Sequence, residues 1–466
     1  MNKKSTLLLV SALGVVFGSC NKLVDGYDIN PNTALDAPST LQLTAAELAH
    51  GFFMSGEAAR TASIWAGVFT GSDRQYSALQ TYITSATDYD GMWQLSYQTT
   101  MAQLRLVENK AQAVGNKQLL GIAQVVEAQM LGTTTALWGD VPYSQAFQEG
   151  KPGTFDAQAT VYAATQALLT DAITNLTSGG NASIPNDIYF TGNKAKWLAV
   201  AHTLKARYFL HVKNYALATA EARLGMNAST GDMAVPFGGA IGSSANTYYS
   251  FLTNDRVAYL SAADSYAAQL LLQRTNAKTR EAVRYRYFYN DKDTTGTTTI
   301  FSKRDPNWID GAFQADSPFP LVSYAENQAI LAESLILTAD APGALTALNS
   351  IRTNNQNTYT GPDARYDAYT PADFNAGGLL NPTASGQSSA QALHKEILTE
   401  KYLSLVGQIE EFNDVRRTGN IIGVPRNATN APDLPQRFLY PQSELNTNPS
   451  TPSPIPGLFV KTTVNQ

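Results

Sequence analysis

The feature that most constrains this chain is apolar spacing of three and four residues, which predicts helices over much of its length. The clearest helix runs from Ala195 to Val212, and an alanine-rich segment follows almost at once, from Tyr215 to Met226. The apolar side of the first helix comprises Trp197, Val200, Ala201, Leu204, Tyr208 and Val212. Small residues in the second segment allow close approach, so we expect the two helices to pack as a pair.

The same design recurs nearer the C-terminus. Helical spacing runs from Leu321 to Leu337, residues 340–342 (Asp-Ala-Pro) interrupt it, and a partner helix follows with Leu345 and Leu348. Two helices joined by a tight turn are the unit of tetratricopeptide-type arrays. We therefore expect a mainly α-helical fold, with helix pairs at about 93–226 and 321–355.

Long segments of a different character separate and follow these helix pairs. They are rich in Gly, Ser, Thr, Asn and aromatic residues, and they occupy about 227–320 and 354–390. Loops of this length inside a compact domain are commonly either disordered or functional. No linker divides the middle of the chain, so we expect one body over 41–466 with loop-rich insertions.

The N-terminus has the pattern of a bacterial lipoprotein. Lys3 and Lys4 precede an apolar run from Leu7 to Phe17, and small residues lead to Cys20, the only cysteine of the chain. The run is shorter than the roughly 20 apolar residues that span a bilayer. We expect a signal peptide at 1–19, lipidation of Cys20 and a tether at 20–40. The alternative is an ordinary cleaved signal in which the cysteine is incidental.

Composition limits the classes of partner. The chain is 44% hydrophobic and 15% charged, enough to bury a large core, and its formal net charge of −5 becomes −7 once Lys3 and Lys4 leave with the signal peptide. A mildly acidic chain lacks the basic surface that binds nucleic acid, so no nucleic-acid partner is expected. Membrane association is expected through the lipid anchor alone.

No motif points to catalysis. The sequence contains no nucleophile elbow, zinc-protease motif or phosphate-binding loop. His202 and His211 fall about 13.5 Å apart along one helix, so we expect no metal site, and nothing implies a cofactor. The adjacent Glu410 and Glu411 point to different helix faces and do not form a glycosidase pair. An enzyme built from carboxylates scattered over the loops is a distant alternative.

Five ordered motifs together carry a family resemblance. Besides the segment around Cys20, they are WGDVPY at 138–143, YAEN at 324–327 with Ala-Glu at 332–333, EEFNDVRR at 410–417 and RFLYPQSELN at 437–446. This combination closely resembles the SusD-like (SusD/RagB) outer-membrane lipoproteins that bind nutrients, over the span from Cys20 to about Asn448.

The resemblance implies a fold, a place and a partner. The fold would be a platform of tetratricopeptide-like helix pairs, forming a right-handed superhelix, with a loop-rich ligand face. The protein would be lipid-anchored at the outer membrane, facing the cell surface, and would deliver a nutrient, most often an oligosaccharide, to a TonB-dependent (SusC-like) transporter. No catalysis is implied. Residues 21–25 lack the acidic cluster that family members commonly carry after the cysteine, which leaves the periplasmic leaflet open.

Ligand residues are expected on loop aromatics and polar side chains. A sugar offers an apolar face to a flat ring and a rim of hydroxyls to groups such as Asp, Asn, Gln or Arg. The segment Asp73, Arg74, Gln75 and Tyr76 provides such a set, and by resemblance it corresponds to a loop of the binding face. The other candidates are Trp308 and the pair Tyr248 and Tyr249.

Other motif residues are expected to be structural. Arg416 and Arg417 are predicted to pair with Glu410, Glu411 or Glu444, with contact to the transporter as the alternative. Trp138 and Tyr143 flank a turn and are predicted to pack inside the protein. The rival to a nutrient-binding role is a structural subunit or lid of the transporter complex, in which the loops bind peptide or no ligand.

Overall fold

The computed structural model describes residues 37–148, 152–290 and 304–466. One compact unit extends from Ser39 to Gln466. The predicted signal peptide, Cys20 and most of the predicted tether lie outside the described residues. No helix within the described ranges has the length and apolar character needed to cross a bilayer.

Helices dominate the compact unit. The long ones are α2 (Ser39–Ser55), α6 (Ala102–Ala113), α7 (Lys117–Trp138), α8 (Gln158–Ser178), α9 (Lys194–His211), α14 (Tyr324–Leu337), α15 (Ala341–Thr358) and α16 (Ser389–Ser404). The shorter ones are α3 (Glu57–Trp65), α4 (Arg74–Gln80), α5 (Asp90–Gln94), α10 (Tyr215–Ala222), α11 (Thr247–Ser250), α12 (Tyr266–Gln273), α13 (Ala282–Phe288), α17 (Ile409–Arg417) and α18 (Gln442–Thr447).

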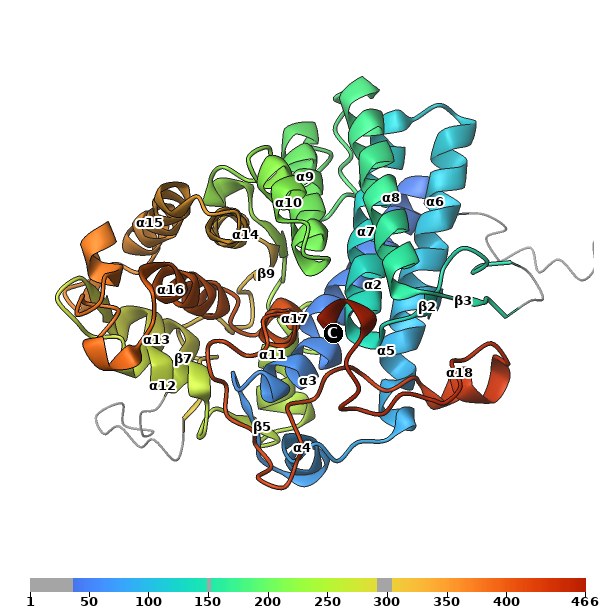
Figure 1. Cartoon of the computed structure of the whole chain (residues 1–466). Coiled ribbons are helices and arrows are strands. Elements are labelled where there is room, and N and C mark those ends of the chain that lie inside the picture. Colours follow the sequence, from blue (N-terminus) through green and yellow to red (C-terminus); the bar gives the residue numbers. More distant parts are fainter. Residues whose placement is uncertain (1–36, 149–151, 291–303) are drawn as a thin grey trace, which may run out of the picture. The chain divides into compact units, whose positions relative to one another are not determined.

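The long helices pack in sequence order. Helix α7 packs on α6 and α8, α9 on α8 and α10, α10 on α14, and α14 on α15 and α16, and Figure 1 shows this succession from the cyan to the brown helices. The predicted mainly α-helical fold built of helix pairs is confirmed. The right-handed superhelix stays a prediction.

Capping residues set the limits of the predicted pairs. The side chains of Asn193, Asn214 and Asp340 cap α9, α10 and α15, each accepting a hydrogen bond from a backbone N–H of the first turn. The helix predicted from Leu321 begins later, at Tyr324, because Ser323 caps it and residues Phe319–Val322 form strand β9. A single hydrophobic pattern does not reveal that change from strand to helix.

The strands are short and form antiparallel pairs, β1 with β5, β2 with β3, β4 with β9, β6 with β10 and β7 with β8. Their bounds are β1 (Thr70–Gly71), β2 (Val141–Pro142), β3 (Phe155–Asp156), β4 (Met233–Val235), β5 (Leu260–Ser261), β6 (Thr279–Glu281), β7 (Tyr289–Asn290), β8 (Asp305–Pro306), β9 (Phe319–Val322) and β10 (Ala364–Tyr366). The insertion predicted at 227–320 thus contains short helices and strands as well as loops.

The motif residues predicted to be structural are buried or half-buried. Trp138 is fully buried and its indole N–H donates to the backbone of Leu439, while Tyr143 is half-buried. Arg417 binds Glu333 of α14 through two hydrogen bonds of 2.6 Å, and Arg416 donates to backbone carbonyls, including those of Gln436 and Ala136. The prediction that Arg416 and Arg417 pair with Glu410, Glu411 or Glu444 is therefore wrong. Instead, the two arginines join α17 to α14, to α7 and to the C-terminal segment.

Candidate functional site

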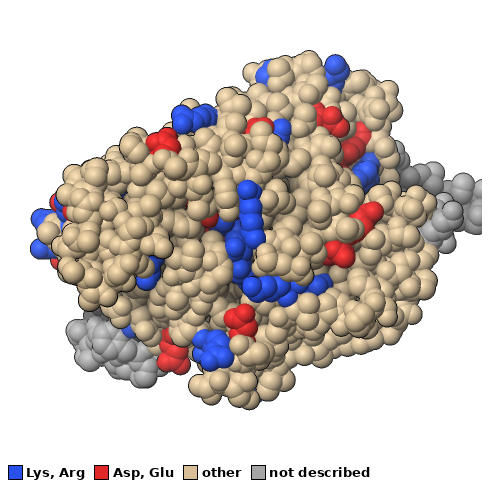
Figure 2. All heavy atoms as spheres, viewed as in Figure 1, with Lys and Arg blue, Asp and Glu red and all other residues tan. Residues whose placement is uncertain are grey.

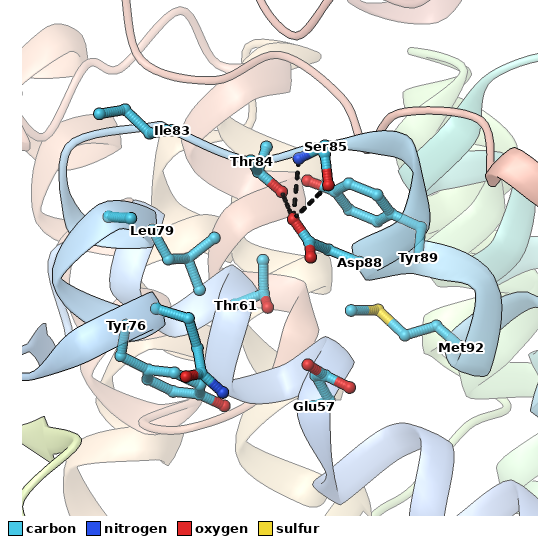
Figure 3. A pocket seen from close by; sticks show the side chains of 12 residues that line it. Glu57, Thr61, Tyr76, Leu79, Ile83, Thr84, Ser85, Asp88, Tyr89 and Met92 are labelled. Atoms are coloured by element: carbon cyan, nitrogen blue, oxygen red, sulfur yellow. Dashed lines mark hydrogen bonds between the residues drawn. The ribbon is translucent and has the colours of Figure 1, made fainter.

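A cavity of about 310 Å³ lies between α3, α4, α5 and the 3₁₀ turn η1 (Ala86–Tyr89). Figure 3 shows side chains from all four elements around it, with Glu57 and Thr61 on α3, Tyr76 on α4 and Met92 on α5. Its volume falls in the range typical of small-molecule sites. Two of the predicted ligand residues, Gln75 and Tyr76, line this cavity. Within the described part of the chain it is therefore the strongest candidate for a ligand site.

A capping box fixes one wall of this cavity. Thr84 donates to an Oδ atom of Asp88 at 2.9 Å, and the backbone N–H of Ser85 donates to the same oxygen at 2.8 Å (Figure 3). These bonds hold the turn that places Tyr89 beside the cavity. The second carboxylate oxygen of Asp88 makes no hydrogen bond to the described residues and remains available as an acceptor.

Three further polar groups line the cavity without a hydrogen-bond partner among the described residues. Tyr89 is 1% exposed and its hydroxyl, although near Thr84, makes no hydrogen bond of normal geometry. The Thr61 hydroxyl, on a residue 2% exposed, and the exposed carboxylate of Glu57 have none either. Buried polar groups usually have partners, so the Tyr89 and Thr61 hydroxyls indicate a place for water or a polar ligand.

The charge of Glu57 depends on its surroundings. Although much of the Glu57 residue is exposed, the atoms around its carboxyl partly desolvate it and raise its pKa. Arg60 opposes this shift, and the negative charge of Asp88 adds to it. The two acidic side chains give the cavity a surplus of hydrogen-bond acceptors. Acceptors of this kind suit the hydroxyl groups of a neutral ligand better than an anion, which they would repel.

An aromatic wall supports the cavity on the α4 side. Tyr76 packs against Phe251 with ring centroids 4.9 Å apart, and its hydroxyl accepts a hydrogen bond of 2.9 Å from Arg60. The Arg60 guanidinium lies 4.0 Å from the centre of the Phe251 ring. Because only 4% of Tyr76 is exposed, it forms part of the wall and is not a free platform for stacking.

The predicted segment 73–76 divides between two places. Gln75 and Tyr76 line the cavity, whereas Asp73 caps α4 by accepting from the backbone N–H of Arg74 at 2.9 Å. The exposed Arg74 side chain points to a different neighbour, the hydroxyl of Tyr259, to which it donates at 3.0 Å. Asp73 and Arg74 thus flank the cavity without lining it.

The other predicted aromatic residues lie elsewhere. Tyr248 is fully buried, stacks on Phe319 and donates its hydroxyl to the Gly407 carbonyl at 2.8 Å. A ring without exposed surface offers no face to a ligand, so this structure contradicts Tyr248 as a contact residue. Tyr249 and Trp308 are half-buried and lie outside the cavity. Their rings meet edge to face, with the ring centroids 6.1 Å apart. A ligand role for these two stays a prediction.

Sequence reasoning missed several residues of the cavity, namely Glu57, Thr61, Asp88, Tyr89 and Met92. The spacing of Ser85 and Asp88 is a capping-box signal and predicts a helical turn, but it does not indicate which helix the turn faces. The described ranges contain no group of three or more His, Cys, Asp or Glu side chains placed to bind a metal ion. On the face shown in Figure 2, charges of both signs are interspersed over a largely uncharged surface.

Comparison with known proteins gives one family and one fold. A family model for SusD-like proteins, described as starch-binding and associating with the outer membrane, matches residues 31–441. No curated protein sequence matches the chain.

Solved structures share the fold at low sequence identity. A SusD/RagB family protein from Bacteroides thetaiotaomicron is 20% identical with a TM-score of 0.66, and the match covers 89% of this chain and 95% of that one. A SusD homologue from Bacteroides fragilis is 18% identical with a TM-score of 0.68, covering 92% and 100%. A chitin-binding SusD homologue from Flavobacterium johnsoniae is 15% identical with a TM-score of 0.67, covering 92% and 97%. With a family model that matches most of its length, the chain belongs to the SusD-like family.

Proposed function

We propose that this protein binds a nutrient glycan in the cavity between α3, α4, η1 and α5. The observation that carries the proposal is a group of polar atoms without a hydrogen-bond partner among the described residues, beside an apolar wall. They are the buried Tyr89 hydroxyl, the Thr61 hydroxyl, the Glu57 carboxylate and one carboxylate oxygen of Asp88. A sugar needs both kinds of surface, hydrogen-bonding groups for its hydroxyls and apolar contact for its C–H face. The starch-binding description of the family and the chitin-binding relatives support a glycan as the ligand class.

The second part of the proposal concerns delivery. We infer that the protein is held at the outer membrane by a lipid on Cys20 and passes its ligand to a TonB-dependent transporter. Family membership supports the outer-membrane location. Each protein–sugar hydrogen bond is replaced by one to water on release, so the net affinity is modest and transfer to a partner is favoured.

A structural role in the transporter complex is the second candidate. The helix pairs from α6 to α15 present a succession of packed helices, and arrays of this kind commonly bind protein partners. This role does not exclude ligand binding, since the cavity is built by α3 to α5 and not by that array.

Isothermal titration with starch and chitin oligosaccharides tests the glycan proposal. We expect binding to the unmodified chain and an affinity about tenfold lower for Gln75→Ala, which loses a hydrogen bond to the sugar. Glu57→Gln is also expected to weaken binding, because it replaces a charged acceptor with a neutral one. Gln112→Ala, on the exposed face of α6, is the matched control and leaves the affinity unchanged. Equal affinity in all four proteins would place the ligand elsewhere.

Co-purification tests the delivery proposal separately. With the tagged full chain produced in its native host, we expect a TonB-dependent transporter to be recovered with it from solubilised outer membranes. Recovery without added glycan, together with an absence of binding heat, favours the structural role. Recovery of the tagged chain alone contradicts both roles at the transporter.

A further inference from the structure

A second cavity, of about 400 Å³, lies between α13, β9, α14, α15 and the turn before α17. It shares no lining residue with the cavity between α3 and α5. Exposed Tyr287 and Thr358 stand at its opening, and buried residues form its floor. Helix α15 and the long insertion after α10 both contribute, so the tertiary fold alone creates this cavity.

Gln408 is one of the polar residues that line this cavity. The residue is 5% exposed, yet its side-chain amide makes no hydrogen bond to any described residue. Gln408 precedes α17 at the N-cap position, but its side chain does not cap the helix. Its amide atoms keep accessible surface at the cavity and have no partner among the described residues, so they are available to water or to a ligand group.

Two acceptors face the same cavity. Asn355, 3% exposed, donates its amide N–H to Glu400 at 2.8 Å, which leaves its Oδ1 atom without a partner among the described residues. One Oδ atom of Asp232 accepts from the backbone N–H of Tyr324 at 2.7 Å, and the other has no described partner. The cavity therefore offers the donors and the acceptor of the Gln408 amide, together with one free acceptor oxygen each on Asn355 and Asp232. The three residues come from separate parts of the chain.

Aromatic rings complete the cavity. Tyr287 and Tyr359 lie with ring centroids 5.6 Å apart, and Phe313 and Phe319 form the opposite part of the lining. Tyr287 is 42% exposed and its hydroxyl makes no hydrogen bond to described residues, so it presents an accessible ring at the opening. These rings provide the apolar contact that a sugar or similar polyol requires.

The fold holds this arrangement in place. Gly407 adopts φ +89°, and a Cβ atom there would lie 3.3 Å from the Phe313 ring, so the tight turn that presents Gln408 depends on glycine. Tyr248 lies behind the cavity, donates to the Gly407 carbonyl and packs against Phe313 at 4.9 Å. The buried tyrosine thus supports the turn and the aromatic lining together.

We propose that this second cavity is a binding site for one neutral sugar unit, separate from the first cavity. Its volume suits a small ligand, and its lining contains aromatic rings, amides and hydroxyls but no Lys, Arg or His. The one acidic side chain of the lining, Asp232, has its pKa raised by burial to about 7, so it carries only part of a negative charge at neutral pH. The proposal goes beyond the proposed function and does not depend on ligand binding in the first cavity.

Protein NMR and isothermal titration of the full chain with maltotriose and with N,N′-diacetylchitobiose test the second site. We expect at least one of these sugars to bind in a way that survives Gln75→Ala but weakens about tenfold in Gln408→Ala, which loses one hydrogen bond. Tyr287→Ala, an exposed change that leaves the core intact, is expected to weaken the same binding. Gln273→Ala, on the exposed end of α12, is the control and changes nothing.

Two results would overturn the second site. One is binding of both sugars that is insensitive to Gln408→Ala and Tyr287→Ala. The other is an absence, at millimolar sugar, of any binding heat or chemical-shift change that depends on these two residues. If Gln408→Ala fails to fold, Tyr287→Ala alone decides between the outcomes. Loss of binding in Gln75→Ala concerns the first cavity only. The second site is tested by Gln408→Ala and Tyr287→Ala.

Discussion

At the scale of single residues, the hydroxyl of Tyr89 is the most informative group in the first cavity. It is buried, lacks a hydrogen bond of normal geometry and stands beside an opening large enough for a ligand. Such a group lowers the stability of the folded protein, because it has lost water without gaining a partner. A sugar hydroxyl that formed a hydrogen bond with Tyr89 would satisfy this group and so contribute to the binding free energy.

Tyr89→Phe is therefore expected to have opposite effects on stability and binding. The free energy of unfolding should stay equal or rise, since the unpartnered hydroxyl is removed, while glycan affinity should fall about fivefold to tenfold. Chemical denaturation and isothermal titration measure the two quantities. Unchanged affinity would remove Tyr89 from the site.

Tyr402→Phe provides the matched control. Tyr402 is 1% exposed, but its hydroxyl donates to the Ala66 carbonyl at 2.7 Å, and the residue lines neither cavity. Its loss is expected to lower the free energy of unfolding by about 1 kcal/mol and to leave glycan affinity as it was. The two tyrosines thus separate a hydroxyl available to a ligand from one used by the fold.

At the scale of secondary-structure elements, α7 and α9 are in close contact at a glycine. A Cβ atom on Gly132 of α7 would lie 2.2 Å from the ring of Tyr208 on α9. Gly132→Ala is expected to lower the free energy of unfolding by about 1–3 kcal/mol, because the helices must separate or the ring must move. Thermal denaturation measures the change.

Gly91 in α5 serves as the control for that change. A Cβ atom there meets no atom within 4 Å, and the backbone is helical. Gly91→Ala is therefore expected to raise stability by about 0.5 kcal/mol through helix propensity. Destabilisation of both variants to the same extent would mean that the close contact of α7 and α9 is not the cause.

Helix α16 is fastened to its neighbours by the buried carboxylate of Glu400. Arg284 donates to it at 2.6 Å, Arg274 at 2.9 Å and Asn355 at 2.8 Å. Burial by itself raises the pKa of Glu400, but Arg284, Arg274 and Arg352 outweigh it and lower the pKa to about 2. Helices α12, α13 and α15 are joined to α16 by this one negative charge.

The pH dependence of stability follows from that shift. Because the folded pKa of about 2 lies below the unfolded value of 4.5, the stabilising effect is complete above pH 4.5 and is lost as pH falls toward 2. This contribution of Glu400 to the free energy of unfolding is on the order of 3 kcal/mol. Glu400→Gln is expected to lose this stability at pH 7 and to show a shallower decline between pH 4.5 and pH 3, measured by urea denaturation. An unchanged pH profile would contradict the assignment.

At the scale of the whole molecule, attachment to the membrane rests on Cys20, which lies outside the described residues. Cells grown with a labelled fatty acid are expected to incorporate it into the unmodified protein and not into Cys20→Ala. The variant is expected to leave the membrane fraction, because no other part of the sequence predicts an anchor. Equal labelling of both proteins would exclude lipidation at this position.

The amino-acid sequence by itself determined the helices and their pairing. Apolar spacing, with caps such as Asn193 and Asp340, depends on neighbours three or four residues away, so it can be read locally. Five ordered motifs also sufficed to place the chain in its family.

Only the tertiary structure decided which side chains face a cavity. Tyr76 and Tyr248 look alike in the sequence, yet one lines a cavity and the other supports a turn from inside the core. Arg417 pairs with Glu333, 84 residues away, and not with its nearby glutamates. Exposure and ion pairing depend on contacts between distant segments, whose geometry is set by packing of the whole body and not by local sequence.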